Sequence, residues 1–550
     1  MGLSTYKVPK ELFLENRKKL VREFQNYLNN NQQEQQQHHE YICYLEGGRS
    51  ETRHDSDHEP IFRQESYFHY LFGVKEPDWS GCINLLTGKT TLFMPKLPPE
   101  YATIMGKIKQ PSFFREEYNV DEVKYTDEAE EYLLSQCSSS NDSQATRSIL
   151  VLKGKNSDSG NEYKPPSFSS PSLQPHIDTQ TLFPILAECR VIKSSHELNL
   201  LRHCTEITSL AHVYAMKHMK PGMMEYQSES LFRHYTYYNF GARHVGYTPI
   251  CGCGPNGAVL HYGHAGAPND RLIQDGDMCL MDMGAEYFCY SSDVTCSYPS
   301  NGKFTERQKV VYEGVLNAQR RVIGMLKPGV SWVECHKAAE EEIITALIEL
   351  GVVVLNADSE SKPESESGSE IESEFESSGN KIQSKTTVKE LVEMRLGGYF
   401  MPHGLGHFIG IDTHDVGGYL PGHQNRIPTL GLKSLRTCRM VLPNMTLTVE
   451  PGLYFIDHFM DELLMESSPL NQYINGHVLN EFRGFGGVRL EDVVVVMEDG
   501  CENFTICPRT VEEVESVMAG GKWPPLQDCD ATLKRKRLTD TSPLGIINMP

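Results

Sequence analysis

The sequence predicts a mixed α/β (α+β) protein with an N-terminal α/β domain and a C-terminal domain of duplicated α+β architecture. Two observations support this prediction. Strand-like and helical runs alternate through the first 185 residues, and a pair of helices separated by a Lys-Pro-Gly stop occurs twice later in the chain. A chain of 550 residues is long enough for roughly two to four domains with a large core.

Residues 1–185 have the pattern of an α/β domain. Apolar residues recur at helical spacing through 8–28, and a tract rich in Asn and Gln follows them. From EYICYLEGG to ILVLKG, strand-like runs such as TTLFMPKL alternate with helical ones, and the Ser- and Pro-rich segments 138–144 and 165–175 are typical of loops. We therefore assign these residues to one N-terminal domain.

The repeated helix pairs define the second domain, which we place at residues 186–520. Ser194 stands three residues before Glu197, which is the spacing of a capping box at the start of a helix. The first helix ends at Lys220-Pro221-Gly222 and the later one at Lys327-Pro328-Gly329, and another helical run follows each stop. The pattern predicts two related halves. Coincidence is the alternative, because Pro and Gly commonly follow helices.

Two segments lack the apolar residues that a folded core requires. Residues 356–385 are acidic and rich in Ser, so we expect a disordered insertion, and we expect a disordered tail over 521–550. The tail contains the basic run 534–537, which resembles a nuclear address, although short basic runs are more often exposed patches.

Composition excludes several classes of partner. The formal net charge of −21 argues against nucleic-acid binding, which depends on Lys and Arg neutralising phosphate. No run reaches the length of about 20 apolar residues that a membrane span requires. The fifteen cysteines include no Cys-x-x-Cys, and no signal peptide is apparent, so we expect reduced thiols and a cytoplasmic protein.

The segment MCLMDMGAEYFCYSSDVTCSYP, residues 278–299, contains two carboxylates in apolar surroundings. Asp282 and Asp293 are both flanked by residues that favour burial. A buried carboxylate without a partner is costly and usually takes up a proton. These two residues therefore need a compensating group, and a metal ion is one candidate.

Three downstream segments carry further ligand types in apolar surroundings. FMPHGLGHFIGIDTHDVGGY contains His403, His407 and His414, but it lacks the HExxH pattern of a zinc-binding helix. Glu450 is expected at the end of a strand, and Glu491 at the start of a very apolar one. A single His or Glu in such a place is more often part of the hydrogen-bonded structure than a ligand.

The whole set favours a metal centre with two divalent ions. Its proposed ligands are four carboxylates and one imidazole: Asp282, Asp293, His407, Glu450 and Glu491. Four anions cannot converge in a core without cations between them. Ligands that are mostly oxygen favour a hard ion such as Mn²⁺. Two such ions can share and activate a bridging hydroxide for hydrolysis of a carbonyl compound, with Glu450 moving a proton.

The motifs that contain these residues resemble the dinuclear pita-bread metallopeptidases. The resemblance rests on LMDMGAEYFCYSSDVT, HGLGHFIGIDTHD, VEPGLYF and GVRLEDVVVV, and it extends to FRQESYFHYLFGVKEP, AVLHYGHAGAPND, SLRTCR and RGFGGVR. It covers about residues 7–520, apart from the polar insertions. It implies a pita-bread fold for the second domain and an aminopeptidase P-like fold for the first.

The resemblance also implies how the ligands are divided between the ions. Asp282 and Asp293 would hold one metal, Asp293 and Glu491 would bridge, and His407 with Glu450 would complete the second site. The sequence departs from the family pattern at none of these positions.

The same resemblance implies the walls of a substrate pocket. His261 and His414 would line it, and His414 would stabilise the oxyanion or the scissile carbonyl. Arg436 would bind the C-terminal carboxylate of a dipeptide, and Tyr247 would lie near the first metal. Two further positions resemble pocket or supporting residues of the family: His403 and Arg489.

The implied activity is hydrolysis of Xaa-Pro dipeptides, and of Xaa-hydroxyproline dipeptides, by a homodimer. Two alternatives remain at this point. One is an Xaa-Pro aminopeptidase with the same fold and ligands but a pocket of different reach. The other is a non-catalytic binding module that recruits partners through the acidic insertion, although such a module would be expected to lose ligands.

Overall fold

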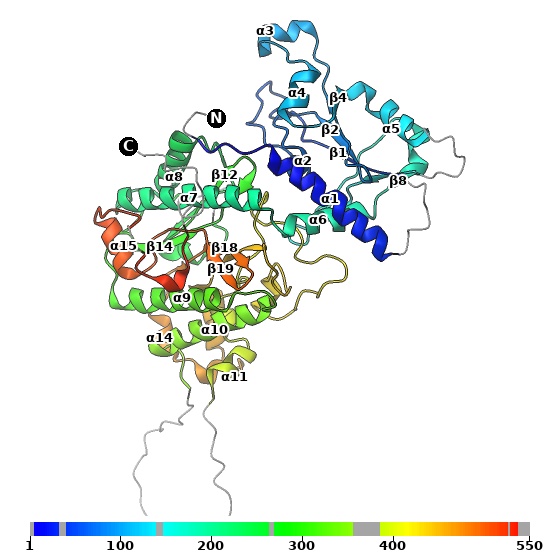
Figure 1. The fold of residues 1–550 in the computed structure, drawn as a ribbon. Coiled ribbons are helices and arrows are strands. Elements are labelled where there is room, and N and C mark those ends of the chain that lie inside the picture. Colours follow the sequence, from blue (N-terminus) through cyan, green and yellow to red (C-terminus); the bar gives the residue numbers. More distant parts are fainter. Residues whose placement is uncertain are drawn as a thin grey trace, which may run out of the picture.

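The computed structural model has two domains (Figure 1): one in the blue and cyan N-terminal part of the chain and one in the green-to-red remainder. The predicted disordered insertion, 356–385, lies outside the described residues. Within the described part of the chain, no helix combines the length and apolar character needed to cross a bilayer. The structure describes residues 5–31, 40–138, 147–262, 269–355, 386–525 and 528–536.

The N-terminal domain is built on a six-stranded mixed sheet of order β4-β3-β2-β1-β5-β8. Strand β1 is antiparallel to β2 and parallel to β5. The strands are β1 (Glu40–Glu46), β2 (Ser80–Asn84), β3 (Thr90–Met94), β4 (Glu122–Tyr125), β5 (Arg147–Val151) and β8 (Ile177–Asp178). The helices are α1 (Glu11–Asn30), α2 (Ser66–Phe72), α3 (Ala102–Met105), α4 (Pro111–Glu117), α5 (Ala129–Ser138) and α6 (Leu182–Val191).

Alternation along β1 explains why both faces of this sheet are covered. Cys43 and Leu45 pack in the same core cluster as Phe24 of α1, whereas Ile42 packs with Leu133 of α5. Successive side chains of a strand point to opposite faces, so one strand contributes to two apolar layers. The predicted boundary at residue 185 falls within α6 and stays a prediction.

The second domain contains the two predicted helix pairs. The pairs are α7 (Ser195–His218) with α8 (Glu225–Phe240), and α9 (Glu306–Met325) with α10 (Trp332–Glu349). The Ser194 side chain accepts a hydrogen bond from the Glu197 amide, and Glu197 accepts one from the Ser194 amide at 2.8 Å, so the predicted capping box is confirmed. Figure 1 places strands β14, β18 and β19 between α7 and α9.

Short sheets fill the space between these helix pairs. Their orders are β10-β11-β14, β13-β12-β9, β15-β18-β19 and β16-β17. The strands are β9 (His244–Val245), β10 (Ile250–Cys253), β11 (Met278–Asp282), β12 (Ala285–Tyr287), β13 (Tyr290–Ser291), β14 (Thr295–Pro299), β15 (Thr446–Val449), β16 (Gly452–Tyr454), β17 (Gly487–Arg489), β18 (Asp492–Met497) and β19 (Gly500–Asn503). The remaining helices are α11 (Val388–Glu393), α12 (Gly397–Phe400), α13 (Asp457–Leu464), α14 (Gly476–Asn480) and α15 (Val511–Met518).

Part of the predicted disordered tail packs against this domain. Leu533 is fully buried, and the Arg535 side chain, only 5% exposed, forms ion pairs with Glu513 at 2.8 Å and with Asp528. A buried carboxylate such as Glu513 needs a cation, and the tail supplies it. Within the basic run, Arg535 is therefore buried in ion pairs, whereas Lys536 is exposed and residues 537–550 lie outside the described chain.

Candidate metal centre and substrate cavity

A pair of antiparallel strands brings Asp282 and Asp293 together. Asp282 ends β11 and lies opposite Thr295 of β14, two residues beyond Asp293. Between them the chain turns back through the β12–β13 hairpin, where Phe288 and Cys289 have φ values of 54° and 64°. The tight hairpin and the register together place both carboxylates at the same end of the β11–β14 pair.

The loop that carries His407 lies directly against β15. A Cβ on Gly406 would approach the Thr448 carbonyl oxygen to 2.0 Å, so this position requires glycine. The His407 amide donates to Thr448 Oγ1 at 3.1 Å, and Nδ1 of its ring lies 2.9 Å from the Phe408 carbonyl oxygen. Because a carbonyl oxygen only accepts, Nδ1 carries the proton and the lone pair of Nε2 faces the cluster.

Glu450 and Glu491 arrive from paired strands, as their sequence contexts predict. Glu450 follows the last residue of β15, and Glu491 precedes the first residue of β18. The two strands are antiparallel with Val449 opposite Asp492, so the two glutamates come from adjacent strand ends. Thr295 Oγ1 donates to Glu491 at 2.7 Å and fixes its orientation.

These side chains form one cluster. His407 Nε2 lies 3.3 Å from an oxygen of Asp293, 3.6 Å from one of Glu450 and 3.9 Å from one of Glu491. Ligand atoms of Asp282, Asp293 and Glu491 lie within 4.8 Å of one another, and so do those of His407, Glu450 and Glu491. Glu491 belongs to both groups, which is the arrangement expected of a bridging carboxylate between two ions.

The electrostatics of the cluster fit divalent cations. Burial, followed by repulsion from Asp282, raises the pKa of Asp293 well above its usual range. Burial and neighbouring carboxylates likewise raise the pKa values of Glu450 and Glu491. Among the described residues, no hydrogen-bond donor reaches the buried Oδ1 of Asp293. The negative charge of these carboxylates is not balanced by protein cations, and their oxygen atoms are the ligands that a hard divalent ion prefers.

Two supporting side chains hold Asp282. The Tyr247 hydroxyl donates to one oxygen of Asp282, and Arg489 Nη2 donates to the other at 2.6 Å. Arg489 Nη1 also donates to the Tyr454 hydroxyl at 2.6 Å. The Arg489 side chain is therefore engaged in orienting a ligand, although it borders the cavity.

The cluster lies at one side of a cavity of about 730 Å³. Pockets of this size are typical of small-molecule sites. The structure brings every residue of the predicted site to this one cavity: Tyr247, His261, Asp282, Asp293, His403, His407, His414, Arg436, Glu450, Arg489 and Glu491.

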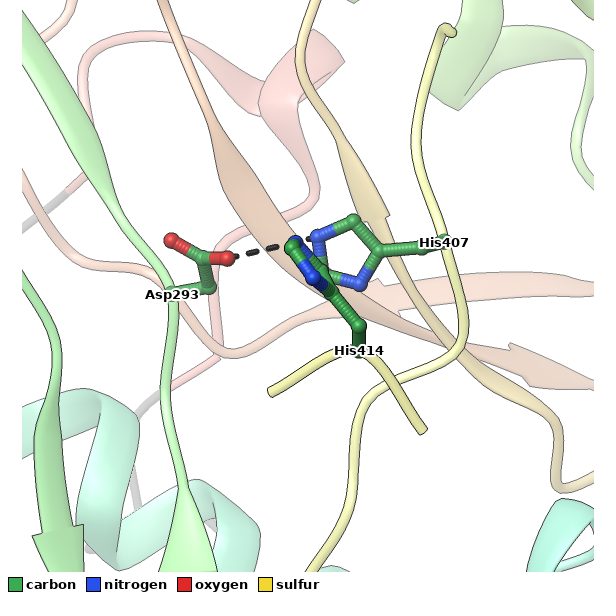
Figure 2. A group of neighbouring side chains, drawn as sticks. All are labelled: Asp293, His407 and His414. Atoms are coloured by element: carbon green, nitrogen blue, oxygen red, sulfur yellow. Dashed lines mark ion pairs between the residues drawn. The ribbon is translucent and has the colours of Figure 1, made fainter. Parts of the chain in front are cut away.

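The histidines around the cavity favour the neutral form. His414 packs its ring 4.5 Å from that of His407, nearly at right angles, and Figure 2 shows both rings close to Asp293. Desolvation, with His407 and Arg436 nearby, lowers the pKa of His414 to about 2. Burial and Arg489 lower the pKa of His403 to about 3, and its Nδ1 lies 3.8 Å from Glu450. Neutral imidazoles can donate hydrogen bonds without adding positive charge beside the metal ligands.

Comparison with known families assigns the fold. The model of metallopeptidase family M24 matches residues 199–498, and the model of the aminopeptidase P N-terminal domain matches residues 13–145. The chain belongs to metallopeptidase family M24. The expected combination of an aminopeptidase P-like N-terminal domain and a pita-bread domain is thereby confirmed.

Relatives of this M24 chain include enzymes with two different names. It is 47% identical to the Xaa-Pro dipeptidase of Homo sapiens, with 94% of this chain and 96% of that protein covered. It is 33% identical to a probable Xaa-Pro aminopeptidase of Coccidioides posadasii, with 87% and 92% covered. Among solved structures, it resembles aminopeptidase PepP of Pseudomonas aeruginosa, with a TM-score of 0.68, 27% identity and coverage of 94% and 99%.

The sequence analysis did not name several cavity residues of this M24 chain, among them Ser157, Asp158 and Arg426. Ser157 and Asp158 come from a hairpin of the N-terminal domain, and Arg426 comes from the loop before Arg436. No local pattern distinguishes them, because Asp158 lies in a polar turn and Arg426 in a loop of mixed composition. Only the packing of the N-terminal domain against the second domain brings Ser157 and Asp158 to the cavity, where Arg426 contacts both.

Proposed function

We propose that this chain is a metal-dependent dipeptidase that hydrolyses Xaa-Pro dipeptides, and Xaa-hydroxyproline dipeptides as well. The observation that carries the proposal is that Arg436 lines the same cavity as the acidic cluster. A planar guanidinium group can bind a carboxylate through two parallel hydrogen bonds. The 47% identity to an Xaa-Pro dipeptidase supports the same conclusion.

The candidate ligands Asp282, Asp293, His407, Glu450 and Glu491 would hold two divalent ions. When bound, such ions supply Lewis acidity and lower the pKa of water so that it becomes a nucleophile at neutral pH. Tyr247 and Arg489 keep Asp282 in one orientation, and Thr295 does the same for Glu491. Supporting contacts of this kind tune metal ligands in proteins generally.

The chain itself binds and orients the substrate. Arg436 binds the C-terminal carboxylate, which holds the substrate in the same cavity as the acidic cluster. Neutral His414 donates a hydrogen bond to the scissile carbonyl oxygen, where negative charge develops. Glu450 accepts a proton from the attacking water and passes it to the proline nitrogen, which must be protonated to leave when the C–N bond breaks. His261 and His403 border the substrate on the cavity wall.

The proline at the second position suits this mode of recognition. An Xaa-Pro bond has no amide N–H, and its ring fixes the backbone. A pocket that recognises the end groups of a dipeptide does not need that N–H. Substrate orientation then comes from the charged terminus at Arg436.

Three finer assignments are part of the proposal. Manganese is the expected metal, because the candidate ligands are mostly oxygen. A homodimer is expected from the family resemblance, and a cytoplasmic location from the many cysteines outside Cys-x-x-Cys motifs. The buried Arg535 argues against a nuclear address in the tail.

The second candidate is an Xaa-Pro aminopeptidase, which the 33% identical relatives and the solved aminopeptidase P structures favour. Full-length protein stripped of metal and reloaded with Mn²⁺ would be assayed on Gly-Pro, Gly-Pro-NH₂ and Gly-Pro-Gly. Faster cleavage of Gly-Pro supports the dipeptidase, whereas preference for Gly-Pro-Gly supports the aminopeptidase. A folded, reloaded protein that cleaves none of the three would be a non-catalytic relative.

A further inference from the structure

A hairpin of the N-terminal domain lines the cavity that also contains the acidic cluster. Its strands are β6 (Gly154–Lys155) and β7 (Glu162–Tyr163). In the turn, the Asn156 side chain accepts hydrogen bonds from the amides of Asp158 and Ser159 at 2.9 and 2.8 Å. Side-chain acceptors of this kind fix a turn in one conformation. The position of Asp158 is therefore set by the backbone of the hairpin.

The carboxylate of Asp158 lies between two arginines of the catalytic domain. Its Oδ2 is 3.0 Å from Arg436 Nη1, and its Oδ1 is 3.1 Å from Arg426 Nη2. The same Arg426 nitrogen donates to the Ser157 carbonyl oxygen at 3.2 Å. Asp158 therefore joins Arg426 to Arg436, the arginine that we assign to the substrate carboxylate.

Arg426 is itself held in place. Its guanidinium lies 4.5 Å from the ring centroid of Tyr419, and Nη1 donates to the Lys433 carbonyl oxygen at 3.2 Å. The Asp158 side chain is 17% exposed, Arg436 24% and Arg426 32%. Partial burial makes charges at this wall interact more strongly than they would in water.

The charge balance of this wall matches one carboxylate. Two guanidinium groups and one aspartate leave a single net positive charge. Among the described residues, Arg436 forms no ion pair besides the one through Nη1, so its other edge can bind a carboxylate through two hydrogen bonds. A dipeptide with its carboxylate at Arg436 thus completes the balance.

We propose that Asp158 determines substrate length, because its carboxylate, paired with Arg436 at 3.0 Å, excludes peptides that continue beyond proline. The inference rests on the proposed dipeptidase function. A tripeptide would bring a neutral peptide group to Arg436 and its own carboxylate toward Asp158. The two carboxylates would repel each other. An unfavourable contact with the wrong substrate is an efficient source of specificity.

The same geometry predicts what the loss of Asp158 would permit. Without its negative charge, Arg426 loses an ion-pair partner one step beyond Arg436. That guanidinium group could then bind the carboxylate of a tripeptide. Asp158 would thus reject longer peptides in two ways, by repulsion and by occupying the cation that they would need.

The test compares kcat/KM for Gly-Pro-Gly with kcat/KM for Gly-Pro in Mn²⁺-loaded protein. Asp158→Asn should raise this ratio about tenfold or more, a common size for the loss of one unfavourable charge contact. Asp158→Ala should raise it as well, whereas Asp158→Glu should keep it low. Adding Arg426→Gln to Asp158→Asn should remove the part of the gain that depends on Arg426 and leave the part that comes from lost repulsion. Glu162→Gln is the matched control, because Glu162 is exposed on the same hairpin and does not line the cavity.

An unchanged or lower ratio in both Asp158→Asn and Asp158→Ala would overturn the inference, as would an equal rise in Glu162→Gln. Thermal unfolding of each variant identifies any that does not fold, and the ratio is then judged on the folded ones. Wild-type protein without Gly-Pro hydrolysis would refute the proposed function itself. Wild-type activity with unresponsive ratios would refute only the role of Asp158.

Discussion

Asp293→Asn should have opposite effects on stability with and without metal. Asp293 lies with Asp282 and Glu491 in a group whose ligand atoms are within 4.8 Å of one another. In the metal-free protein these carboxylates repel each other, as the raised pKa values of Asp293 and Glu491 indicate. The amide is nearly isosteric and uncharged, so the substitution removes repulsion but also removes a ligand.

The magnitude follows from the distances. Two unit charges about 4.8 Å apart interact by about 3 kcal/mol at an effective dielectric constant of about 20. Arg489 offsets part of the charge of Asp282, so a net gain of about 1–3 kcal/mol is expected for the metal-free variant. This corresponds to a rise in Tm of a few degrees. Metal at about 1,000 times Kd would stabilise the wild type by about 4 kcal/mol, and the variant by much less.

Thermal unfolding in EDTA and in Mn²⁺ measures both effects. The variant should unfold at a higher temperature than wild type in EDTA, at a lower one in Mn²⁺, and it should lose Gly-Pro hydrolysis. Asp57→Asn is the control, because Asp57 is exposed. A variant that is less stable than wild type in EDTA, or that binds metal and turns over normally, would refute the assignment of the cluster.

Three further outcomes are expected. Arg436→Ala should lower kcat/KM for Gly-Pro about 10- to 100-fold and affect Gly-Pro-NH₂ little, since a hydrogen bond to a charged group contributes about 1.5–3 kcal/mol; equal losses on both substrates would contradict its role. Burial lowers the pKa of His69 to about 3, so this residue alone should contribute a loss of about 2 kcal/mol of stability on acidification from pH 7 to 5. The reason is that the unfolded chain takes up a proton at this residue near pH 6.5 and the folded one does not. His69→Leu should remove that component in urea titrations, whereas His58→Gln at an exposed site should retain it. Arg535→Gln should destabilise the protein by about 2 kcal/mol because it leaves Glu513 without its cation, and Lys536→Gln, at a largely exposed side chain, should have a much smaller effect on Tm.

Local patterns were sufficient to predict the two helix pairs of the second domain and the placement of acidic residues on strands or at strand ends. The Ser194 capping box, the Lys-Pro-Gly stops and the strand contexts of Asp282, Glu450 and Glu491 are all properties of short segments. Such signals depend on neighbours within a few residues, so a single sequence contains them. Because burying an isolated carboxylate is energetically unfavourable, these residues were expected to share metal ions.

Two features of the structure depend on contacts between residues far apart in the sequence. One is the packing of the tail, and the other is the pairing of Asp158 with the arginines of the cavity. Residues 528–536 have a polar composition, yet Arg535 meets Glu513 in a buried ion pair. Asp158 meets Arg426 and Arg436 across the domain boundary, more than 260 positions along the chain. Composition cannot reveal such pairs, because each partner taken alone resembles an ordinary surface charge.

By itself, the sequence determined which residue types were available for a metal centre and on which strands and loops they would lie, because burial patterns and turns are local. Only the tertiary structure decided that these side chains face one cavity, and that a hairpin from another domain closes it with Asp158. The physical reason is that electrostatic interactions depend on distance in space, and the packing of the two domains sets that distance.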